Sequence, residues 1–257
     1  WSGLCETWDG GTCGPKKTIA AAIDETSSGD SVVIADGTYT GTGNHGIYHG
    51  NYLVGPKHGL TIRSVNGPQN CVIDAENDVF IYLKLLGGES MVIEGLTVID
   101  GLAQWGGAIS GEFSESPRPT LTVRDCVFDS CASESGGAAV CVFHVDVYVY
   151  GCEFVESSVV YGGSAASVRL LEDCVFHDNS CGGGGATVVR RCLSYHNQGT
   201  GLSGSLIEDC VTADNGVSMA GQPSDAIGGG IRATNATIRN CVIALNGVQS
   251  DDNHDAL

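Results

Sequence analysis

The chain has 257 residues, and 30 Asp and Glu residues against 12 Lys and Arg residues give it a formal net charge of −18. A charge of this sign repels phosphate and anionic lipid, so we expect neither nucleic-acid binding nor adhesion to membranes. Hydrophobic residues make up 42% of the chain, which is enough for a core and excludes intrinsic disorder. No apolar run approaches the roughly 18 residues of a spanning helix, so membrane insertion is not expected either.

The N-terminal segment, residues 1–30, is predicted to end in a capping helix. Residues 15–26 begin with Pro15, contain three consecutive alanines, and place Ile19 and Ile23 on one helical face. The first residues lack the basic and apolar regions of a signal peptide, so we expect a mature or trimmed chain. A short amphipathic helix at this point would cover the open end of a stack of strands, as solenoid proteins require.

A repeated unit occupies most of the remaining chain. Glycine clusters precede short apolar strands in GGAIS (106–110), GGAAVCV (136–142), GGSAASV (162–168), GGGGATVV (182–189) and GGGIRAT (228–234). Short apolar strands also lead into six regularly placed cysteines, which are Cys126, Cys152, Cys174, Cys192, Cys210 and Cys241. The spacings between these cysteines are 26, 22, 18, 18 and 31 residues. A constant unit with variable insertions indicates a repeat array.

A small polar residue recurs five positions after each cysteine of the repeat. Two repeats carry Cys131 and Ser157 there, and the other four carry the asparagines Asn179, Asn197, Asn215 and Asn246. The apolar residues around this position alternate with polar ones, which indicates strands and not helices. If the repeats stack, the asparagines form a ladder of side-chain amides and the cysteines form a column beneath it.

The repeat predicts an all-β chain that folds as a single-stranded right-handed parallel β-helix, a solenoid with an N-terminal helical cap. The β-helix is expected over residues 31–248, followed by an acidic tail at 249–257. Glycine pairs are expected to supply the positive-φ bends between its faces. The alternative is an antiparallel sandwich with chance glycine clusters, which would not require a fixed interval between cysteine and asparagine.

The even count of 12 cysteines, with no CxxC pair, favours an oxidising compartment and therefore an extracellular or cell-surface location. The six cysteines outside the column are the better candidates for disulfides, and Cys5 and Cys13 are expected to staple the N-terminal segment, to each other or to Cys71. The full set of candidates is Cys5, Cys13, Cys71, Cys131, Cys141 and Cys181. Their connectivity stays open.

Three early segments resemble the opening coils of secreted right-handed parallel β-helix proteins of the pectate-lyase-like superfamily. They are TIAAAIDETSSGDSVVIADGTYTGTGN, LTIRSVNGPQNCVIDAEN and GLTVIDGLAQWGGAIS. The later units are similar to those of bacterial cell-surface β-helix proteins, including polymorphic outer-membrane proteins. The resemblance covers about residues 15–247 and implies the fold. It leaves the activity open, because this superfamily holds lyases, hydrolases, adhesins and inert surface proteins.

We expect no cofactor, with calcium at an acidic cluster as the alternative. Asp74, Glu76 and Asp78 alternate in CVIDAENDV, so on a strand they would project from one face as oxygen ligands. The alternative is an exposed acidic loop. Resemblance to calcium-dependent pectate lyases would imply a nearby basic residue as the catalytic base, for which Arg63 and Lys84 are the nearest candidates. No lyase motif surrounds them, so no catalytic residue is assigned.

Other candidate sites are more scattered. His45 and His49 lie close enough in sequence to share a metal, and Asn235 begins the one N-x-[ST] glycosylation sequon. Several aromatic residues could form a face that stacks against sugars, with packing at the cap or in loops as the alternative. These aromatic residues are Trp1, Trp8, Tyr39, Tyr48, Tyr52, Trp105 and Tyr161.

We expect a non-enzymatic extracellular structural protein: a disulfide-supported β-helical rod that associates end to end into a surface layer or filament. This expectation rests on a C-terminus without a matching cap, the even cysteine count and the lack of a catalytic cluster. Two alternatives stay open, a polysaccharide lyase or hydrolase of the pectate-lyase-like superfamily and an adhesin that binds surface glycans. The net charge opposes a polyanionic substrate unless calcium bridges the two.

Overall fold

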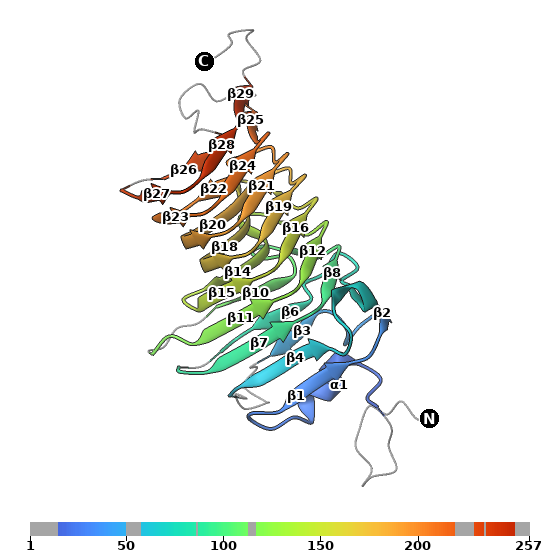
Figure 1. The fold of residues 1–257 in the computed structure, drawn as a ribbon. Helices are drawn as coiled ribbons and strands as arrows, with labels where there is room; N and C mark the ends of the chain where they lie inside the picture. The colour runs from blue at the N-terminus through green and yellow to red at the C-terminus, as the bar shows by residue number, and fades with distance from the viewer. Residues whose placement is uncertain are drawn as a thin grey trace.

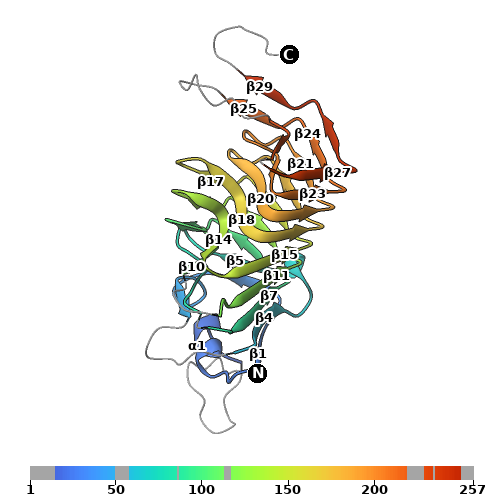
Figure 2. The same cartoon turned by 90° about the vertical axis from the view of Figure 1, so that its left-hand side faces the viewer.

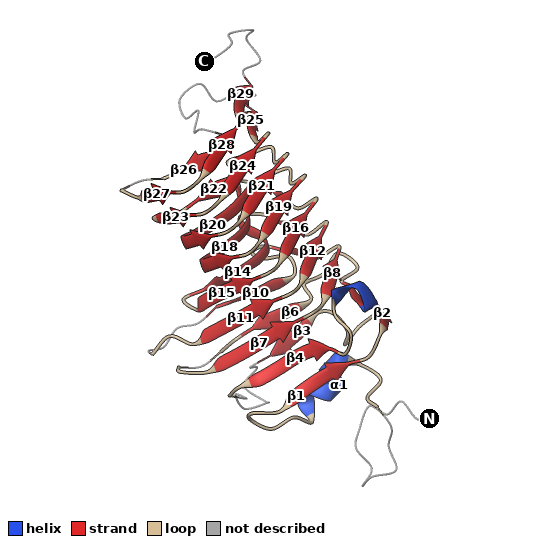
Figure 3. Cartoon of the chain, viewed as in Figure 1, coloured by secondary structure: helices blue, strands red, loops and turns tan. Residues whose placement is uncertain are grey.

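The computed structural model describes residues 15–49, 58–85, 87–112, 117–218, 229–233 and 235–249 (Figure 1). In these residues the chain winds into a parallel β-helix, in which strands of successive coils pair in parallel. The predicted fold class is therefore confirmed. The chain is almost entirely strand and loop, as Figure 3 shows. No helix in the described ranges is both long and apolar enough to span a membrane.

Each coil contributes a strand to up to three faces of the solenoid. Face 1 contains β1 (Ser31–Ile34), β4 (Leu60–Ser64), β7 (Ser90–Glu94), β11 (Thr120–Arg124), β15 (Asp146–Tyr150), β23 (Leu206–Glu208) and β27 (Thr237–Arg239). Face 2 contains β2 (Gly37–Tyr39), β5 (Cys71–Asp74), β8 (Thr97–Ile99), β12 (Val127–Asp129), β16 (Glu153–Val155), β19 (Val175–His177), β21 (Leu193–Tyr195), β24 (Val211–Ala213) and β28 (Val242–Ala244).

Face 3 completes most of the coils. It contains β3 (Ile47–His49), β6 (Ile81–Leu83), β10 (Ile109–Glu112), β14 (Gly136–Phe143), β22 (Leu202–Ser203) and β26 (Ile231–Arg232). Two long strands bend through faces 3 and 1, and they are β18 (Gly163–Glu172) and β20 (Gly182–Arg190). Short corner strands between faces 2 and 3 are β9 (Leu102–Ala103), β13 (Ala132–Ser133), β17 (Ser158–Val159), β25 (Gly216–Ser218) and β29 (Gly247–Gln249).

The first coil is capped by the helix α1 (Ile19–Asp24), which lies against the end that carries β1 (Figure 2). Thr18 is its N-cap, and its hydroxyl accepts a hydrogen bond from the Ala21 N–H at 3.2 Å. Ile19 and Ile23 are buried against the core, as their spacing predicts. The helix is shorter than the predicted 15–26 because it begins after this cap. A 3₁₀ turn, η1 (Pro68–Asn70), is the other helical element described.

The core is built from columns of like residues, because parallel pairing places equivalent positions of successive coils one above another. Phe128, Phe154 and Phe176 are fully buried, and their rings stack at centroid distances of 5.0 and 4.8 Å. Offset aromatic stacking of this kind adds to the free energy gained from burial alone.

The asparagines also lie in a column and are hydrogen-bonded in series. Each side-chain amide donates to the next side-chain oxygen, at 2.7 Å from Asn179 to Asn197, 2.8 Å from Asn197 to Asn215 and 2.9 Å from Asn215 to Asn246. The Asn179 side-chain oxygen accepts from the Ser157 N–H at 2.9 Å, which extends the ladder by one coil.

Glycine makes the bend at three of the predicted pairs, since Gly106, Gly136 and Gly162 have a positive φ, but other residues make most of the corners on either side of face 2. The residue before the column cysteine has a positive φ in most coils, and it is Asp125, Asp173, Arg191, Asp209 or Asn240. The residue before the asparagine position also has one, and it is Ser130, Glu156, Asp178, His196, Asp214 or Leu245. At Gly184 the glycine serves packing instead, because a Cβ there would lie 2.7 Å from Leu171 and 2.8 Å from Phe176.

The disulfide prediction is wrong for every candidate that the structure describes. Cys71, Cys131, Cys141 and Cys181 are free and buried, while Cys5 and Cys13 lie outside the described residues. The six column cysteines are free as well.

Most of the described thiols lie near backbone carbonyl oxygens, and those of the column also lie near one another. The Cys126 thiol, for example, lies 3.2 Å from the Arg124 carbonyl oxygen, and the Cys181 thiol lies 3.5 Å from that of Ser157. Burial raises the pKa of Cys131 and Cys181 to about 12, which keeps them protonated and unreactive. An extracellular location therefore loses its support from the cysteines and remains a proposal.

Candidate functional site

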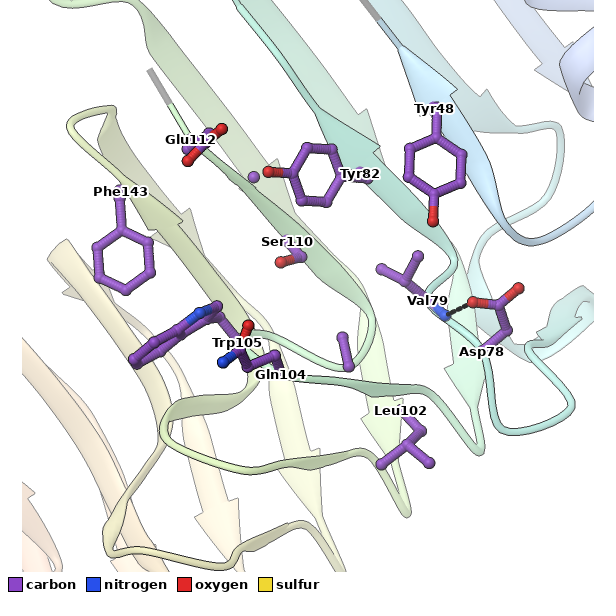
Figure 4. Close-up of a pocket in the computed structure, with 12 residues that line it drawn as sticks. Tyr48, Asp78, Val79, Tyr82, Leu102, Gln104, Trp105, Ser110, Glu112 and Phe143 are labelled. Carbon is purple, nitrogen blue, oxygen red and sulfur yellow. Dashed lines mark hydrogen bonds between the residues drawn. The ribbon is translucent and has the colours of Figure 1, made fainter. Parts of the chain in front are cut away.

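A hollow lies on face 3, between coils that are distant in sequence (Figure 4). Its volume is about 380 Å³. The lining residues come from β3, β6, β9, β10 and β14 and from the segments before β6 and β10. They are Tyr48, Asp78, Val79, Tyr82, Leu102, Ala103, Gln104, Trp105, Ser110, Gly111, Glu112 and Phe143. We call this hollow the aromatic groove.

The register of the strands determines which side chains form the floor of the aromatic groove. Tyr48, Tyr82 and Ser110 are paired residues on β3, β6 and β10, so their side chains stand in one outward column. Their neighbours Ile81 and Ile109 point inward and are fully buried. Period-two alternation along each strand thus directs one set of side chains into the core and the other into the groove.

Four aromatic rings form the walls. Tyr48 and Tyr82 lie 5.6 Å apart between ring centroids, and Trp105 meets Phe143 edge to face at 4.9 Å. Tyr48 is 64% exposed and Phe143 is 38% exposed, although both are large and hydrophobic. Exposed rings that converge on one hollow are typical of a binding surface, whereas single exposed hydrophobic residues scattered over a protein are not.

The polar side chains that line the groove carry carboxylates, hydroxyls and one amide. In Figure 4 the Tyr82 hydroxyl points toward Glu112, Ser110 lies below the ring and Gln104 lies beside Trp105. Burial raises the pKa of Tyr82, the negative charge of Glu112 raises it further, and Lys84 acts in the opposite direction. The Tyr82 phenol therefore stays protonated at neutral pH and is available as a hydrogen-bond donor.

The acidic cluster lies at the edge of this groove but not in the predicted arrangement. β5 ends at Asp74, and Glu76 follows in a turn with a φ of 50°. The prediction that the carboxylates alternate on one strand face is therefore wrong for Glu76 and Asp78. The Asp74 side chain accepts from the Glu76 N–H at 3.0 Å, and Asp78 accepts from the Val79 N–H at 2.7 Å.

His45 occupies the space between two of these carboxylates. Its Nε2 lies 2.8 Å from Glu76, and its Nδ1 lies 3.6 Å from Asp78. Hydrogen bonds from His45 and from the Gly41 N–H lower the pKa of Glu76. Within the described ranges, no group of three or more His, Cys, Asp or Glu side chains is placed to hold a metal ion. The His49 side chain, its predicted partner, lies outside what the structure describes.

The other predicted residues are dispersed. Arg63 lies on β4 of face 1, Asn235 lies exposed on a turn, and Tyr161 is 78% exposed in the loop after β17. The Tyr39 hydroxyl donates to the Ala35 carbonyl oxygen at 2.9 Å, which is a packing role. Trp1, Trp8 and Tyr52 fall outside the described residues.

The sequence analysis named Tyr48, Trp105 and Asp78 but missed the other residues of the groove. Tyr82, Glu112 and Phe143 belong to three different coils, and nothing in the linear sequence brings them together. The alternation in the segment 81–83, with Tyr82 between two buried aliphatic residues, was the one available signal that its ring faces outward.

No protein-family model and no curated protein matches this chain. Two solved structures are similar in fold. One is a rhamnogalacturonan lyase, with a TM-score of 0.45 and 12% identity over 100% of this chain and 88% of that chain. The other is the A-module of the mannuronan C-5 epimerase AlgE4 from Azotobacter vinelandii, with a TM-score of 0.30 and 12% identity over 89% of this chain and 91% of that chain.

Proposed function

We propose that this protein binds a carbohydrate chain in the aromatic groove of face 3. The observation that carries the proposal is the convergence of four rings, from Tyr48, Tyr82, Trp105 and Phe143, on one open hollow with a polar floor. Sugar rings present apolar C–H faces and a rim of hydroxyls. Aromatic side chains can pack against the C–H faces, and the Ser110, Gln104 and Glu112 side chains can hydrogen-bond the hydroxyls.

The scaffold supports such a role, because the groove is built largely on strands of a stacked solenoid. Its side chains are held by the register of β3, β6, β10 and β14 before any ligand arrives. A preorganised site loses little conformational entropy on binding, which favours affinity for a flexible polymer.

The test is a panel of neutral and acidic oligosaccharides measured by isothermal titration calorimetry with the wild-type chain and with Trp105→Ala. Loss of the indole is expected to weaken binding roughly tenfold or more, since stacked aromatic contacts carry most of the proposed energy. Tyr150→Ala is the matched control, because Tyr150 is a half-buried ring on β15 of face 1. Equal affinity of the wild type and Trp105→Ala for every bound sugar would contradict the proposal.

A second candidate is cleavage of the bound glycan, and the Glu112 carboxylate near the Tyr82 phenol favours it. In hydrolysis, the protonated phenol would donate its proton to the departing glycosidic oxygen while Glu112 takes a proton from the attacking water. The water oxygen would then bond to the anomeric carbon as the glycosidic bond breaks. New reducing ends should appear with the wild type and disappear with Glu112→Gln and Tyr82→Phe, whose binding should persist.

We also propose self-association, but through a geometry that differs from the predicted end-to-end filament. An extracellular setting remains a proposal as well. The last described coil exposes Val242, Ile243 and Leu245, which are 56%, 53% and 82% exposed. At the opposite end α1 covers the first coil. Head-to-tail stacking into a filament would have to displace this helix. Two copies that meet through their last coils would not, so a closed dimer is the form the cap favours.

A further inference from the structure

We infer that the aromatic groove continues past Phe143 into a second hollow, and that this second hollow binds an anionic substituent of the same glycan. The inference rests on the proposed function and specifies its ligand. The second hollow measures about 250 Å³ and lies where β14 turns into β15. Its charged residues are Arg118, Asp146 and Arg169, and we call it the arginine hollow.

Phe143 connects the two hollows, because it lines both. Strand register gives the same result: Ser110 of the groove pairs with Cys141, which pairs with Ser167 of the arginine hollow. Neighbouring coils of a β-helix are about 4.8 Å apart along the axis. The two hollows therefore follow one another along the solenoid, and an extended polymer that lies along face 3 would reach both.

The arginine hollow concentrates positive charge in a strongly acidic chain. The Nη1 atoms of Arg118 and Arg169 approach the same Asp146 oxygen, at 3.7 and 3.3 Å. Both arginine side chains are more than half exposed, at 58% and 53%. Two guanidinium groups thus share one carboxylate, which orients them but leaves an excess of one positive charge and several N–H donors facing solvent.

A planar guanidinium presents a fork of donors that matches carboxylate and sulfate oxygens, and hydrogen bonds between charged groups are the stronger class. Ser167 and Thr187 line the same hollow and would add hydroxyl donors. A carboxylate and a sulfate ester share this chemistry, so the ligand class is a glycan that carries either group.

The aromatic groove limits how many carboxylate or sulfate groups the glycan can carry. Asp78 and Glu112 line it, and their carboxylates would repel an anionic sugar bound there. The ligand is therefore neutral where it meets Trp105 and anionic where it meets Arg169. This arrangement fits a sparsely substituted glycan and disfavours a polyuronate, which is charged on every residue.

The first test examines the arginines directly and does not depend on the groove. Methyl glucuronide, galactose 6-sulfate and methyl galactoside are titrated into protein with ¹⁵N-labelled arginine, and the Nε resonances are followed by NMR. The resonances of Arg118 and Arg169 should shift with the two anionic sugars and stay in place with the neutral one. Arg124, which pairs with Glu94 on face 1 at 2.8 Å, is the internal control. Equal shifts at Arg124, or none at Arg118 and Arg169, would overturn the inference.

The second test joins the two hollows. Xylo-oligosaccharides with and without one glucuronate branch, galactan oligosaccharides with and without one sulfate ester, and polygalacturonate are compared by calorimetry. The substituted chain should bind about tenfold more tightly than its neutral parent, a gain that Arg169→Gln removes and Arg124→Gln keeps. Asp146→Asn should increase the gain, because it removes the competing carboxylate. If the parent and the substituted chains bind equally, the arginine hollow is refuted but the groove is not. If no oligosaccharide binds by calorimetry while the arginine resonances still shift with the anionic sugars, the groove alone is refuted.

Discussion

Single asparagine side chains hold neighbouring coils together at one corner of the solenoid. Asn197 is 1% exposed, and its amide group donates to the Phe176 carbonyl oxygen at 3.1 Å and to Asn215 at 2.8 Å. Its side-chain oxygen accepts from the backbone and side-chain amides of Asn179, at 3.2 and 2.7 Å. Alanine at this position would leave several buried donors and acceptors without partners, and each such group costs free energy.

We therefore predict that Asn197→Ala lowers the free energy of unfolding by about 3 kcal/mol, because more than one buried polar group loses its partner. Urea denaturation followed by circular dichroism measures the change. Asn66→Ala is the control, since Asn66 is exposed and its amide bonds Asp36 at the surface, at 3.1 and 2.9 Å. A cost for Asn197→Ala no larger than that for Asn66→Ala would show that the ladder does not stabilise the fold.

Among the elements, the outer surface of face 2 carries a charged column that crosses strand boundaries. His177 on β19 lies 2.8 Å from Glu153 on β16 and 2.7 Å from Asp178, and its ring stacks on Tyr195 of β21 at 5.0 Å. Burial lowers the pKa of His177, but the hydrogen bonds to Asp178 and Glu153 outweigh it, so the pKa is raised overall. The protonated imidazolium thus links the strands through paired carboxylates.

This raised pKa predicts the sign of a pH dependence. The contribution of His177 to stability is fully present below its unfolded-state pKa, near 6.5, and is lost as the pH rises through the higher folded-state pKa. The melting temperature of the wild type should therefore fall more between pH 6 and pH 8.5 than that of His177→Gln. His58→Gln, at an exposed position before β4, should behave like the wild type. Parallel profiles for the wild type and His177→Gln would contradict the assignment.

At the scale of the whole molecule, the two ends of the solenoid differ. The end at β1 is closed by α1, whose Ile19 and Ile23 side chains are buried against the core. The last described coil exposes apolar side chains, including Leu245, whose φ of 54° lies in the left-handed region. The proposed dimer would bury this apolar surface.

Leu245→Asp tests the proposed dimer without straining the backbone, because aspartate tolerates the left-handed region better than leucine does. The wild type should show a concentration-dependent increase in mass by analytical ultracentrifugation, toward twice the mass of one chain and no further. The variant should sediment as a monomer at every concentration. A wild type that stays monomeric would contradict the proposed dimer, and one that forms long polymers would support a filament instead.

The local sequence was sufficient to predict the architecture, because a parallel β-helix repeats the same short-range pattern in every coil. The fixed interval between cysteine and asparagine marks one corner of the coil, and the alternation around it assigns the strands. Ile19 and Ile23 identify the cap from their helical spacing alone. The predicted glycine bends occur at Gly106, Gly136 and Gly162. The bends beside face 2 were not predicted, because Asp125, Ser130 and their equivalents adopt a positive φ through their position in the coil and not through their residue type.

The candidate site was decided by the tertiary structure. Tyr48, Tyr82, Trp105 and Phe143 are spread over almost a hundred residues, and they meet because insertions of different length still bring β3, β6, β10 and β14 into register. The stacking of coils likewise decided which thiols meet, since parallel pairing brings the column cysteines of neighbouring coils within hydrogen-bonding reach of one another. The sequence by itself thus determined the repeat, the asparagine register and the cap, which depend on spacing within a coil. Only the stacking of coils decided which outward side chains share a groove, because that depends on contacts between residues far apart along the chain.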